Sequence, residues 1–225
     1  MANSFYYSVA LNQSNLVEVR MEDNSRCSWF ENSPWVELID ITQRLEVERI
    51  FPGLRRVALD LGAGDGGFAL AYALRYPDTG ILAVERLLGR ARKIARGVSR
   101  LGLQNVRVLR LESFYTVKYL LPPESVDEIH IMHPDPWPKR RHHKYRIFSE
   151  EFLQCCYNVL RPKGFIRLTT DHTGFLAHAL REAARCEGLV MTPWVPDENY
   201  PQSDFERNFR KNLKLVFRQQ WKKIS

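Results

Sequence analysis

Several features of membrane-spanning and secreted proteins are missing from this sequence of 225 residues. No stretch approaches the ~20 consecutive apolar residues of a transmembrane helix, so we expect no membrane-spanning segment. The start, MANSFYYSVALNQSN, has no basic head followed by an apolar run, which argues against a secretory signal. Only four cysteines are present, and they form no C-x-x-C pair. Few and unpatterned cysteines favour a reduced, cytoplasmic protein over one held together by disulfides.

Motifs of two common enzyme classes are also absent. The sequence has no G-x-S-x-G elbow, which argues against a serine hydrolase. His130 and His133 are an odd number of residues apart, so on a strand they would face opposite sides and could not bind one ion together. No cysteine and histidine spacing typical of zinc is present, so we expect no metal site.

The composition that remains is that of a basic globular protein. A hydrophobic content of 44% is enough to bury the core of one domain. The sequence has 33 Lys and Arg against 26 Asp and Glu, a formal charge of +7, which permits a polyanionic partner. The excess is concentrated, because residues 86–110 hold eight basic side chains and no acid, and residues 139–146 hold five more basic side chains. We interpret these stretches as a surface for RNA, whose binding should weaken as salt rises.

Short apolar runs alternate with helical patterns through most of the chain. The runs predicted as strands are VALDLG (57–62), ILAVE (81–85), VRVLRL (106–111), VDEIHIMH (126–133) and FIRLTTD (165–171). Helical patterns lie between them, at 87–102, 149–160 and 175–186. This alternation predicts right-handed crossovers and a mostly parallel sheet. The final run, 213–221, alternates apolar and polar residues and is predicted as an antiparallel strand at the sheet edge.

The domain organisation follows from the same patterns. Residues 1–54 are predicted as an N-terminal extension with one helix over 32–53, where Ser33 can cap the helix and Pro52 can stop it. Residues 55–225 are predicted as the α/β domain. In an open sheet of this kind, ligands bind beyond the carboxyl ends of the strands, so functional residues are expected there.

A glycine loop, residues 60–67, follows the first predicted strand and opens a helix. The glycines that fit G-x-G-x-x-G are Gly62, Gly64 and Gly67. Glu85 ends the next strand, where an acid can bind ribose hydroxyls of a dinucleotide or of S-adenosylmethionine. Asp60 and Asp65 would repel a pyrophosphate at this loop but attract the cationic methionine end of S-adenosylmethionine. The charges therefore favour the methyl donor.

A proline-rich loop, HPDPWPKRRHHKYR (133–146), follows the fourth predicted strand. Its prolines at alternate positions restrict the backbone, so we expect a rigid loop. Asp135 should face the donor pocket, and Trp137 could either stack on a base or pack into the core. The basic residues Lys139, Arg140, Arg141, Lys144 and Arg146 are interpreted as a clamp for a phosphate backbone rather than as a solvated charge run.

These residues resemble a known family. The glycine loop with Glu85 is similar to class I methyltransferases, and residues 133–146 resemble the DPWPKKRH-type signature of the tRNA (guanine-N7-)-methyltransferases. The resemblance continues through FIRLTTD (165–171) and SDFERNF (203–209), and covers about residues 55–220. It implies a Rossmann-like class I methyltransferase fold, with a mostly parallel seven-stranded sheet and helices on both faces.

The resemblance also implies an activity and a set of site residues. The activity is methyl transfer from S-adenosylmethionine to N7 of a guanine in tRNA, with Asp135 as the catalytic residue. The implied cofactor-binding residues are Asp60, Gly62, Gly64, Glu85, Arg86, Glu112, Ser113 and Asp135. The implied substrate-binding residues are Lys139, Arg140, Arg141, His142, Asp171, Ser203, Asp204, Phe205 and Glu206.

Several positions leave other interpretations open. Asp65 stands where the family has lysine, His133 where phenylalanine is common, and Tyr145 where arginine is usual. The chain could therefore methylate a small nitrogen heterocycle or another RNA, or bind RNA on an inactive scaffold, and a dehydrogenase is a more distant alternative. Glu112 could be a plain surface acid, and Asp171 or Thr173 could simply cap the next helix.

Overall fold

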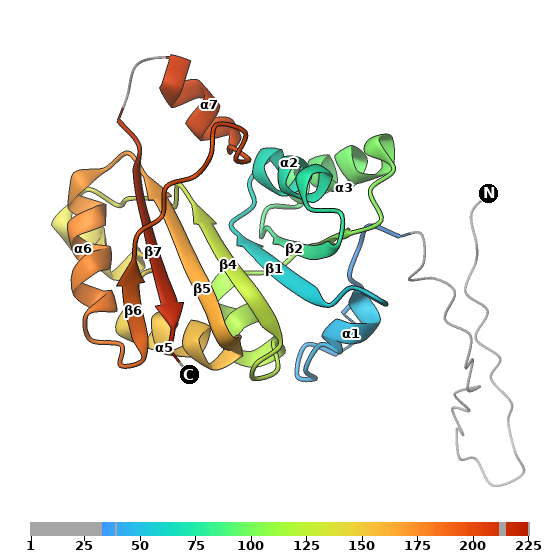
Figure 1. Ribbon diagram of the computed structural model, residues 1–225, viewed down its shortest axis with the longest axis horizontal. Helices are drawn as coiled ribbons and strands as arrows, with labels where there is room; N and C mark the ends of the chain where they lie inside the picture. Colours follow the sequence, from blue (N-terminus) through green and yellow to red (C-terminus); the bar gives the residue numbers. More distant parts are fainter. Residues whose placement is uncertain (1–32, 39, 212–214, 225) are drawn as a thin grey trace, which may run out of the picture. The chain divides into compact units, whose positions relative to one another are not determined.

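A seven-stranded β-sheet organises the part of the chain that the computed structural model describes, residues 33–38, 40–211 and 215–224 (Figure 1). The strands are β1 (Arg56–Leu61), β2 (Thr79–Val84), β3 (Val106–Leu109), β4 (Val126–Met132), β5 (Leu160–Thr170), β6 (Leu189–Thr192) and β7 (Phe217–Lys223). They lie in the order β3-β2-β1-β4-β5-β7-β6. Strands β1 to β5 pair in parallel, and β7 is antiparallel to both β5 and β6. The predicted mostly parallel, seven-stranded sheet is confirmed.

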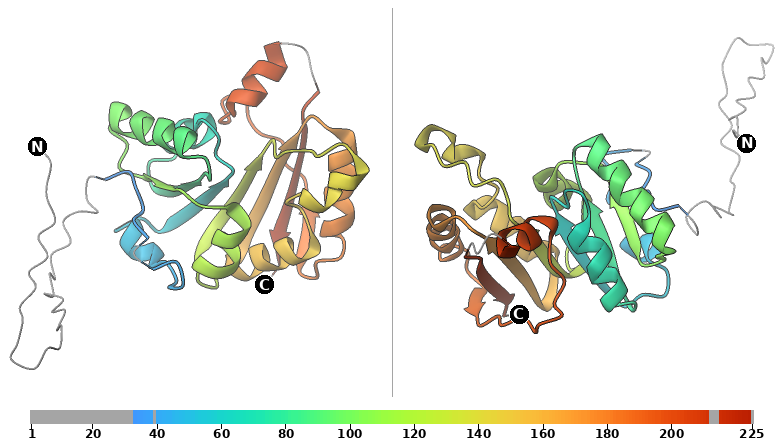
Figure 2. Two further views of the ribbon diagram at one scale, coloured as in Figure 1. Left: turned by 180° about the vertical axis from the view of Figure 1, so that it is seen from behind. Right: turned by 90° about the horizontal axis from the view of Figure 1, so that it is seen from above.

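Helices cover both faces of the sheet, as the doubly apolar strands require (Figure 2). They are α1 (Val47–Ile50), α2 (Gly67–Arg75), α3 (Leu88–Leu101), α4 (Ser113–Tyr115), α5 (Glu150–Val159), α6 (Thr173–Ala183) and α7 (Asp204–Lys211), with a π-helical turn η2 (Thr116–Leu120) and a 3-10 turn η3 (Arg140–Tyr145). Phe68 of α2 and Ile94 of α3 belong to one buried core, whereas Phe152 of α5 and Phe175 of α6 belong to another. None of the described helices is long and apolar enough to cross a membrane.

The helix predicted over 32–53 is wrong for most of its length. Only α1 is helical, and residues 34–36 instead run along β3, where Val36 N donates to Val108 O at 2.9 Å and Val108 N donates to Pro34 O at 2.6 Å. β3 is the strand at one edge of the sheet. Its free backbone groups require partners more strongly than the local sequence prefers a helix. Residues 1–32 of the predicted extension lie outside the described residues, and its boundary at residue 54 stays a prediction.

The C-terminal strand is antiparallel as predicted, but it does not lie at the sheet edge. β6 pairs with the outer side of this strand, β7, and the sequence predicts no strand at β6. Its four residues show no strict alternation, since only Leu189 is buried. The first residues of the run predicted over 213–221 lie outside the described part of the chain.

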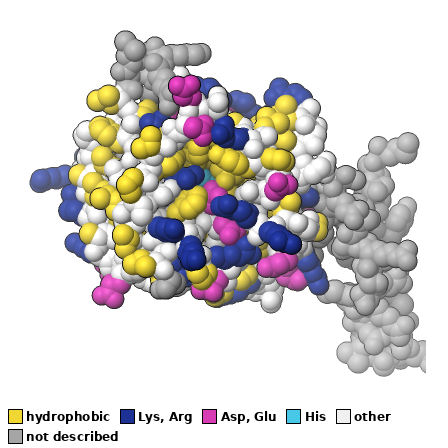
Figure 3. All heavy atoms as spheres, viewed as in Figure 1, with side chains coloured by type: hydrophobic (Ala, Val, Ile, Leu, Met, Phe, Trp, Pro, Cys, Tyr) yellow, Lys and Arg dark blue, Asp and Glu magenta, His cyan; other side chains and the backbone are white. Residues whose placement is uncertain are grey.

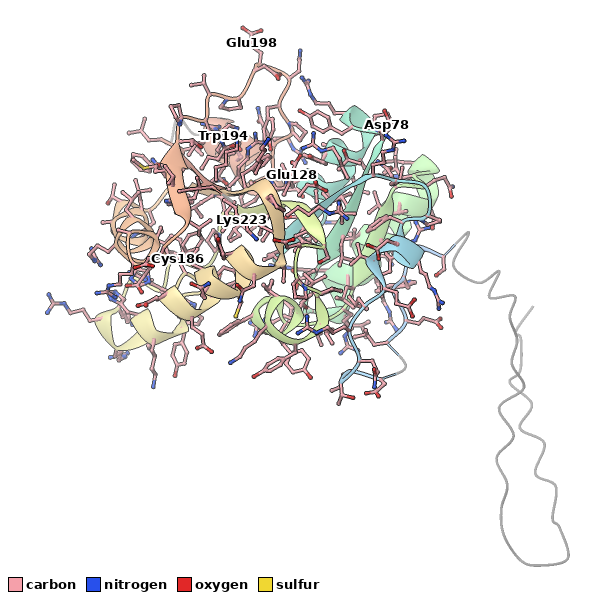
Figure 4. The ribbon with its side chains drawn as sticks, turned by 60° about the horizontal axis from the view of Figure 1, so that its bottom comes forward. Asp78, Glu128, Cys186, Trp194, Glu198 and Lys223 are labelled. Carbon is pink, nitrogen blue, oxygen red and sulfur yellow. The ribbon has the colours of Figure 1, made fainter. Side chains whose placement is uncertain are left out.

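A loop, residues 193–203, crosses the sheet face formed by β4, β5 and β7. Arg167 of β5 holds this loop: its guanidinium stacks on Trp194 at 4.9 Å and donates to the Tyr200 hydroxyl at 3.1 Å. Glu128 of β4, which is labelled in Figure 4, lies on the same face. It accepts a hydrogen bond from the Tyr72 hydroxyl at 2.5 Å. The loop leads directly into α7, so these contacts fix where α7 begins, above the carboxyl ends of the strands (Figure 1).

Gly80 of β2 provides a test of the packing between α1 and the sheet. A Cβ atom at Gly80 would lie 2.6 Å from carbons of the buried Phe51 ring. We therefore expect Gly80→Ala to lower the free energy of unfolding by about 1–3 kcal/mol through overpacking. Gly89 of α3 has nothing within 4 Å of such an atom, so Gly89→Ala is the matched control and should not destabilise. Urea unfolding measures the free energy of unfolding of both variants. Equal losses of stability would contradict the close packing of Phe51 against Gly80.

Candidate active site

A cleft with a volume of about 920 Å³ lies at the carboxyl ends of the strands, between the glycine loop, the proline-rich loop and the start of α7. Parallel strands end at the same edge, which brings residues far apart in sequence to one place. The predicted site residues that line the cleft are Asp60, Gly62, Gly64, Glu85, Arg86, Glu112, Ser113, Asp135, Ser203, Asp204 and Phe205. All eight residues predicted to bind the cofactor are among them.

The glycine loop is held in place by Glu85. Gly64 N donates to Glu85 Oε2 at 2.9 Å, and Leu87 N donates to Glu85 Oε1 at 2.8 Å. Gly62 and Gly64 have φ angles of +77° and +59°, which side-chain-bearing residues rarely adopt. A carboxylate offers about four acceptor positions, so Glu85 retains acceptor capacity for a ligand after binding two amides.

Asp60 is buried without a partner. Its side chain is 1% exposed, and neither carboxyl oxygen has a hydrogen-bond partner in the described part of the chain. Burial, and then the charge of Glu85, raises the pKa of Asp60 to about 8. Burying a polar group without a hydrogen bond is costly, so a cationic ligand that donates hydrogen bonds would satisfy this carboxyl.

Two other acids near the glycine loop have local partners. Glu112 accepts hydrogen bonds from Phe114 N at 2.9 Å and Tyr115 N at 2.7 Å, so it caps α4 and is held in a fixed orientation at the cleft wall. Asp65, which stands in the family's lysine position, forms an ion pair with Lys93 of α3 at 2.6 Å. Lys93 therefore largely offsets the charge of Asp65, which acts less on the cleft than the sequence suggests.

Arg146 holds the proline-rich loop rather than facing a ligand. It is buried, its Nε donates to Pro136 O at 2.9 Å, and its terminal nitrogens donate to Trp137 O and Gly174 O at 3.4 Å. The prediction that Arg146 belongs to a phosphate clamp is wrong. Proline has no N–H group, so the loop carbonyls between the prolines have few backbone donors, and they accept hydrogen bonds from the guanidinium instead. The other basic residues of this run, Lys139, Arg140, Arg141 and Lys144, are exposed.

Trp137 lies at the cleft wall rather than in the core. Its ring centre is 5.3 Å from that of Tyr145 and 5.7 Å from that of His142. Trp137 and Tyr145 both line the cleft, and Tyr145 is 56% exposed. The two rings offer an aromatic surface beside Asp135, which is exposed between two prolines.

The remaining predicted substrate residues lie outside the cleft lining. Lys139 to His142 lie at and within η3, and Asp171 follows β5. Glu206 is buried and forms an ion pair with Arg218 of β7. The alternative that Asp171 or Thr173 caps α6 is wrong, because the cap is His172, whose Nδ1 accepts from Phe175 N at 3.1 Å.

Some cleft residues are not identified by the sequence analysis. Leu87, Arg90 and Asn208 line the cleft, as does His133, whose pKa burial lowers. Helical spacing in the sequence could have identified two of these residues, Arg90 and Asn208. Arg90 follows Leu87 by three residues, and Asn208 follows Phe205 by three, so each pair shares one side of a helix.

Asp60→Asn should raise the stability of the ligand-free protein in a pH-dependent way. The pKa of Asp60 is about 8 in the folded protein against an ordinary value of 3.8, so between these values the unfolded chain loses a proton that the folded chain keeps. The free energy of unfolding therefore falls across this window because of Asp60, and an amide removes that loss. Denaturant unfolding of wild type and variant across the window should show a widening gap in favour of the variant. A gap that does not depend on pH would contradict the assignment.

Comparison with known proteins shows the family of this chain. A family model described as "Putative methyltransferase" matches residues 55–219. The tRNA (guanine-N(7)-)-methyltransferase of Corynebacterium diphtheriae is 35% identical over 183 residues, which cover 79% of this chain and 70% of that protein. The protein of the same name from Nitrosospira multiformis is 34% identical over 166 residues, covering 72% of each.

Solved structures support the same fold. The 16S rRNA methyltransferase KamB aligns with a TM-score of 0.58 at 18% identity, covering 79% of this chain and 92% of that one. At this identity the likeness concerns the fold alone, and it confirms the class I methyltransferase fold. The sequence matches described above cover most of the chain and show the family as well as the fold. The chain therefore belongs to the tRNA (guanine-N7-)-methyltransferase family.

Proposed function

We propose that this protein transfers a methyl group from S-adenosylmethionine to N7 of a guanine in tRNA, in the cytoplasm. The observation that carries the proposal is one cleft that combines the glycine loop, the unpartnered Asp60 and Asp135 on a rigid loop. Relatives named for this activity are up to 35% identical to this chain, which supports the same substrate.

The residues of the cleft fit the methyl donor. S-adenosylmethionine, when bound, supplies an activated methyl group on a positively charged sulfur. Asp60 offers a buried, unpartnered carboxyl to the ammonium of its methionine end. Glu85 retains acceptor positions for the ribose hydroxyls, and Gly62 and Gly64 have no side chains that would block close approach. Arg86, Glu112 and Ser113 border the same space.

Guanine N7 has a lone pair and no proton, so the chain does not need to supply a general base. The task of the protein is to align the base with the donor and to offset the positive charge that develops on the purine. Asp135 can accept hydrogen bonds from guanine N1–H and its amino group, and its carboxylate favours that charge. Arg146 and the neighbouring prolines hold Asp135 in place before the substrate binds, which lowers the entropy lost on alignment.

The exposed residues around the cleft fit the rest of the nucleotide and its backbone. Lys139, Arg140, Arg141 and His142 lie next to the cleft on an exposed turn and are proposed to contact phosphates. Asp171 and residues 203–206 are proposed to contact the nucleotide. Trp137 and Tyr145 offer a stacking surface for a base.

Asp135→Asn tests the function directly. We expect kcat for tRNA methylation to fall by about 100- to 1,000-fold, because the amide no longer offsets charge on the purine. The measurement is incorporation of labelled methyl groups into bulk tRNA, followed by mapping of N7-modified guanines. Asp78→Asn, an exposed carboxylate at the start of β2, is the control and should retain wild-type activity. Near-normal methylation by the Asp135 variant, or label found only in small molecules, would contradict the proposal.

Donor affinity should rise with pH toward about 8. Binding the donor's ammonium requires the charged form of Asp60, whose pKa is about 8 in the free protein. The affinity should therefore increase up to about tenfold per pH unit below this value. Burial lowers the pKa of His130, the register partner of Asp60 on β4, so the rise toward pH 8 is not assigned to His130. Fluorescence or calorimetric titration measures the slope, which Asp60→Asn should flatten; a pH-independent wild-type affinity would count against this role.

A further inference from the structure

The structure sorts the eight basic residues between Arg86 and Arg110 by what they contact. Arg86 and Arg90 line the cleft, and Lys93 forms its ion pair with Asp65. Arg107 is buried and donates to backbone carbonyls of Gln104 and Val106. The other four basic residues, Arg92, Arg96, Arg100 and Arg110, are exposed.

Three of these form one row on helix α3. Arg92, Arg96 and Arg100 are four residues apart, so their side chains lie one above another along the outer side of the helix. We call them the arginine row; it spans about 12 Å at about 1.5 Å per residue. The opposite side of α3, with Ala91, Ile94, Ala95 and Val98, is buried against the sheet. The row is therefore carried by a helix whose other side is packed against the sheet.

The arginine row has no acidic counterpart. No ion pair joins it to any residue in the described ranges, and the sequence from 86 to 110 contains no acid. Like charges four residues apart destabilise a helix by about 0.2–0.5 kcal/mol per pair, so the row carries a cost that nothing within α3 offsets. On the face shown in Figure 3, Lys and Arg side chains lie among Asp and Glu side chains.

The row extends away from the cleft on the side opposite to η3. α3 begins next to the cleft-lining residues Arg86 and Leu87, and the exposed basic turn η3 follows Trp137 of the other wall. Figure 2 (right) looks onto the carboxyl edge of the strands and shows α3 and η3 on opposite sides of it. An RNA whose guanine enters the cleft would meet basic side chains in both directions.

We propose that the arginine row binds backbone phosphates of the tRNA outside the cleft, up to about 15 Å from Arg90, at about 1.5 Å per helical residue. This inference rests on the proposed function. It assigns the row a role in selecting substrates: a folded tRNA reaches the row, whereas a short oligonucleotide that fills only the cleft does not.

The test is the triple variant Arg92→Gln, Arg96→Gln and Arg100→Gln in the full chain. KM for tRNA at physiological salt should rise at least about tenfold, and the slope of log affinity against log salt should become shallower by about 2–3, as three lost phosphate contacts predict. kcat at saturating tRNA and donor affinity should stay at wild-type values. KM for a short RNA oligonucleotide with one guanine should also be unchanged.

A matched control separates the row from net charge. Arg55→Gln, Lys163→Gln and Arg181→Gln together remove the same charge from exposed sites elsewhere. If this control loses tRNA affinity as much as the row variant does, or if the row variant keeps the wild-type KM and salt slope, the proposal is overturned. Direct tRNA binding is measured in parallel. A wild-type protein that binds tRNA through the row but methylates none would refute the proposed function while supporting the row.

Discussion

The burial of two carboxyl groups at neighbouring strand ends is the constraint on which the site depends. Glu85 and Asp60 are 5% and 1% exposed at the ends of β2 and β1. Glu85 accepts hydrogen bonds from the amide of Gly64, which lies in the glycine loop in a left-handed conformation, and from the amide of Leu87. Among the residues that the structure describes, Asp60 receives no such partner. The folded chain therefore keeps a group that is unfavourable alone and becomes favourable when a cation binds, an example of stability given up at a functional site.

The other wall of the cleft is stabilised by two arginines that do not line the cleft themselves. Arg146 binds the carbonyls of the proline-rich loop, and Arg167 holds the loop that leads into α7. Neither guanidinium faces the cleft lining. Both act by fixing backbone segments that have little regular hydrogen bonding of their own. In this chain, arginines thus serve two distinct purposes: the buried Arg146 and the half-buried Arg167 shape the site, and exposed arginines on α3 and η3 present charge to solvent.

The sequence predicts the elements whose signals are local and misses those that depend on distant partners. The buried strands, the apolar stripe of α3 and its terminal glycine are strong local patterns, and the structure has them. The pairing of residues 34–36 with β3 and the position of β6 outside β7 depend on which sheet edges are free. Arg146 belongs to a basic run in the sequence, and only the fold shows that it turns inward. The glycine loop, Glu85 and Asp135 could be predicted to lie together because parallel strands end at one edge.

We propose that the cleft holds a cationic methyl donor through Asp60. Calorimetric titration of S-adenosylmethionine near neutral pH, in two buffers with different ionisation enthalpies, counts the protons exchanged on binding. Because Asp60 is mostly protonated in the free protein and charged in the complex, release of about one proton per donor is expected, and Asp60→Asn should release none. Binding by the wild-type protein without proton release would contradict this claim.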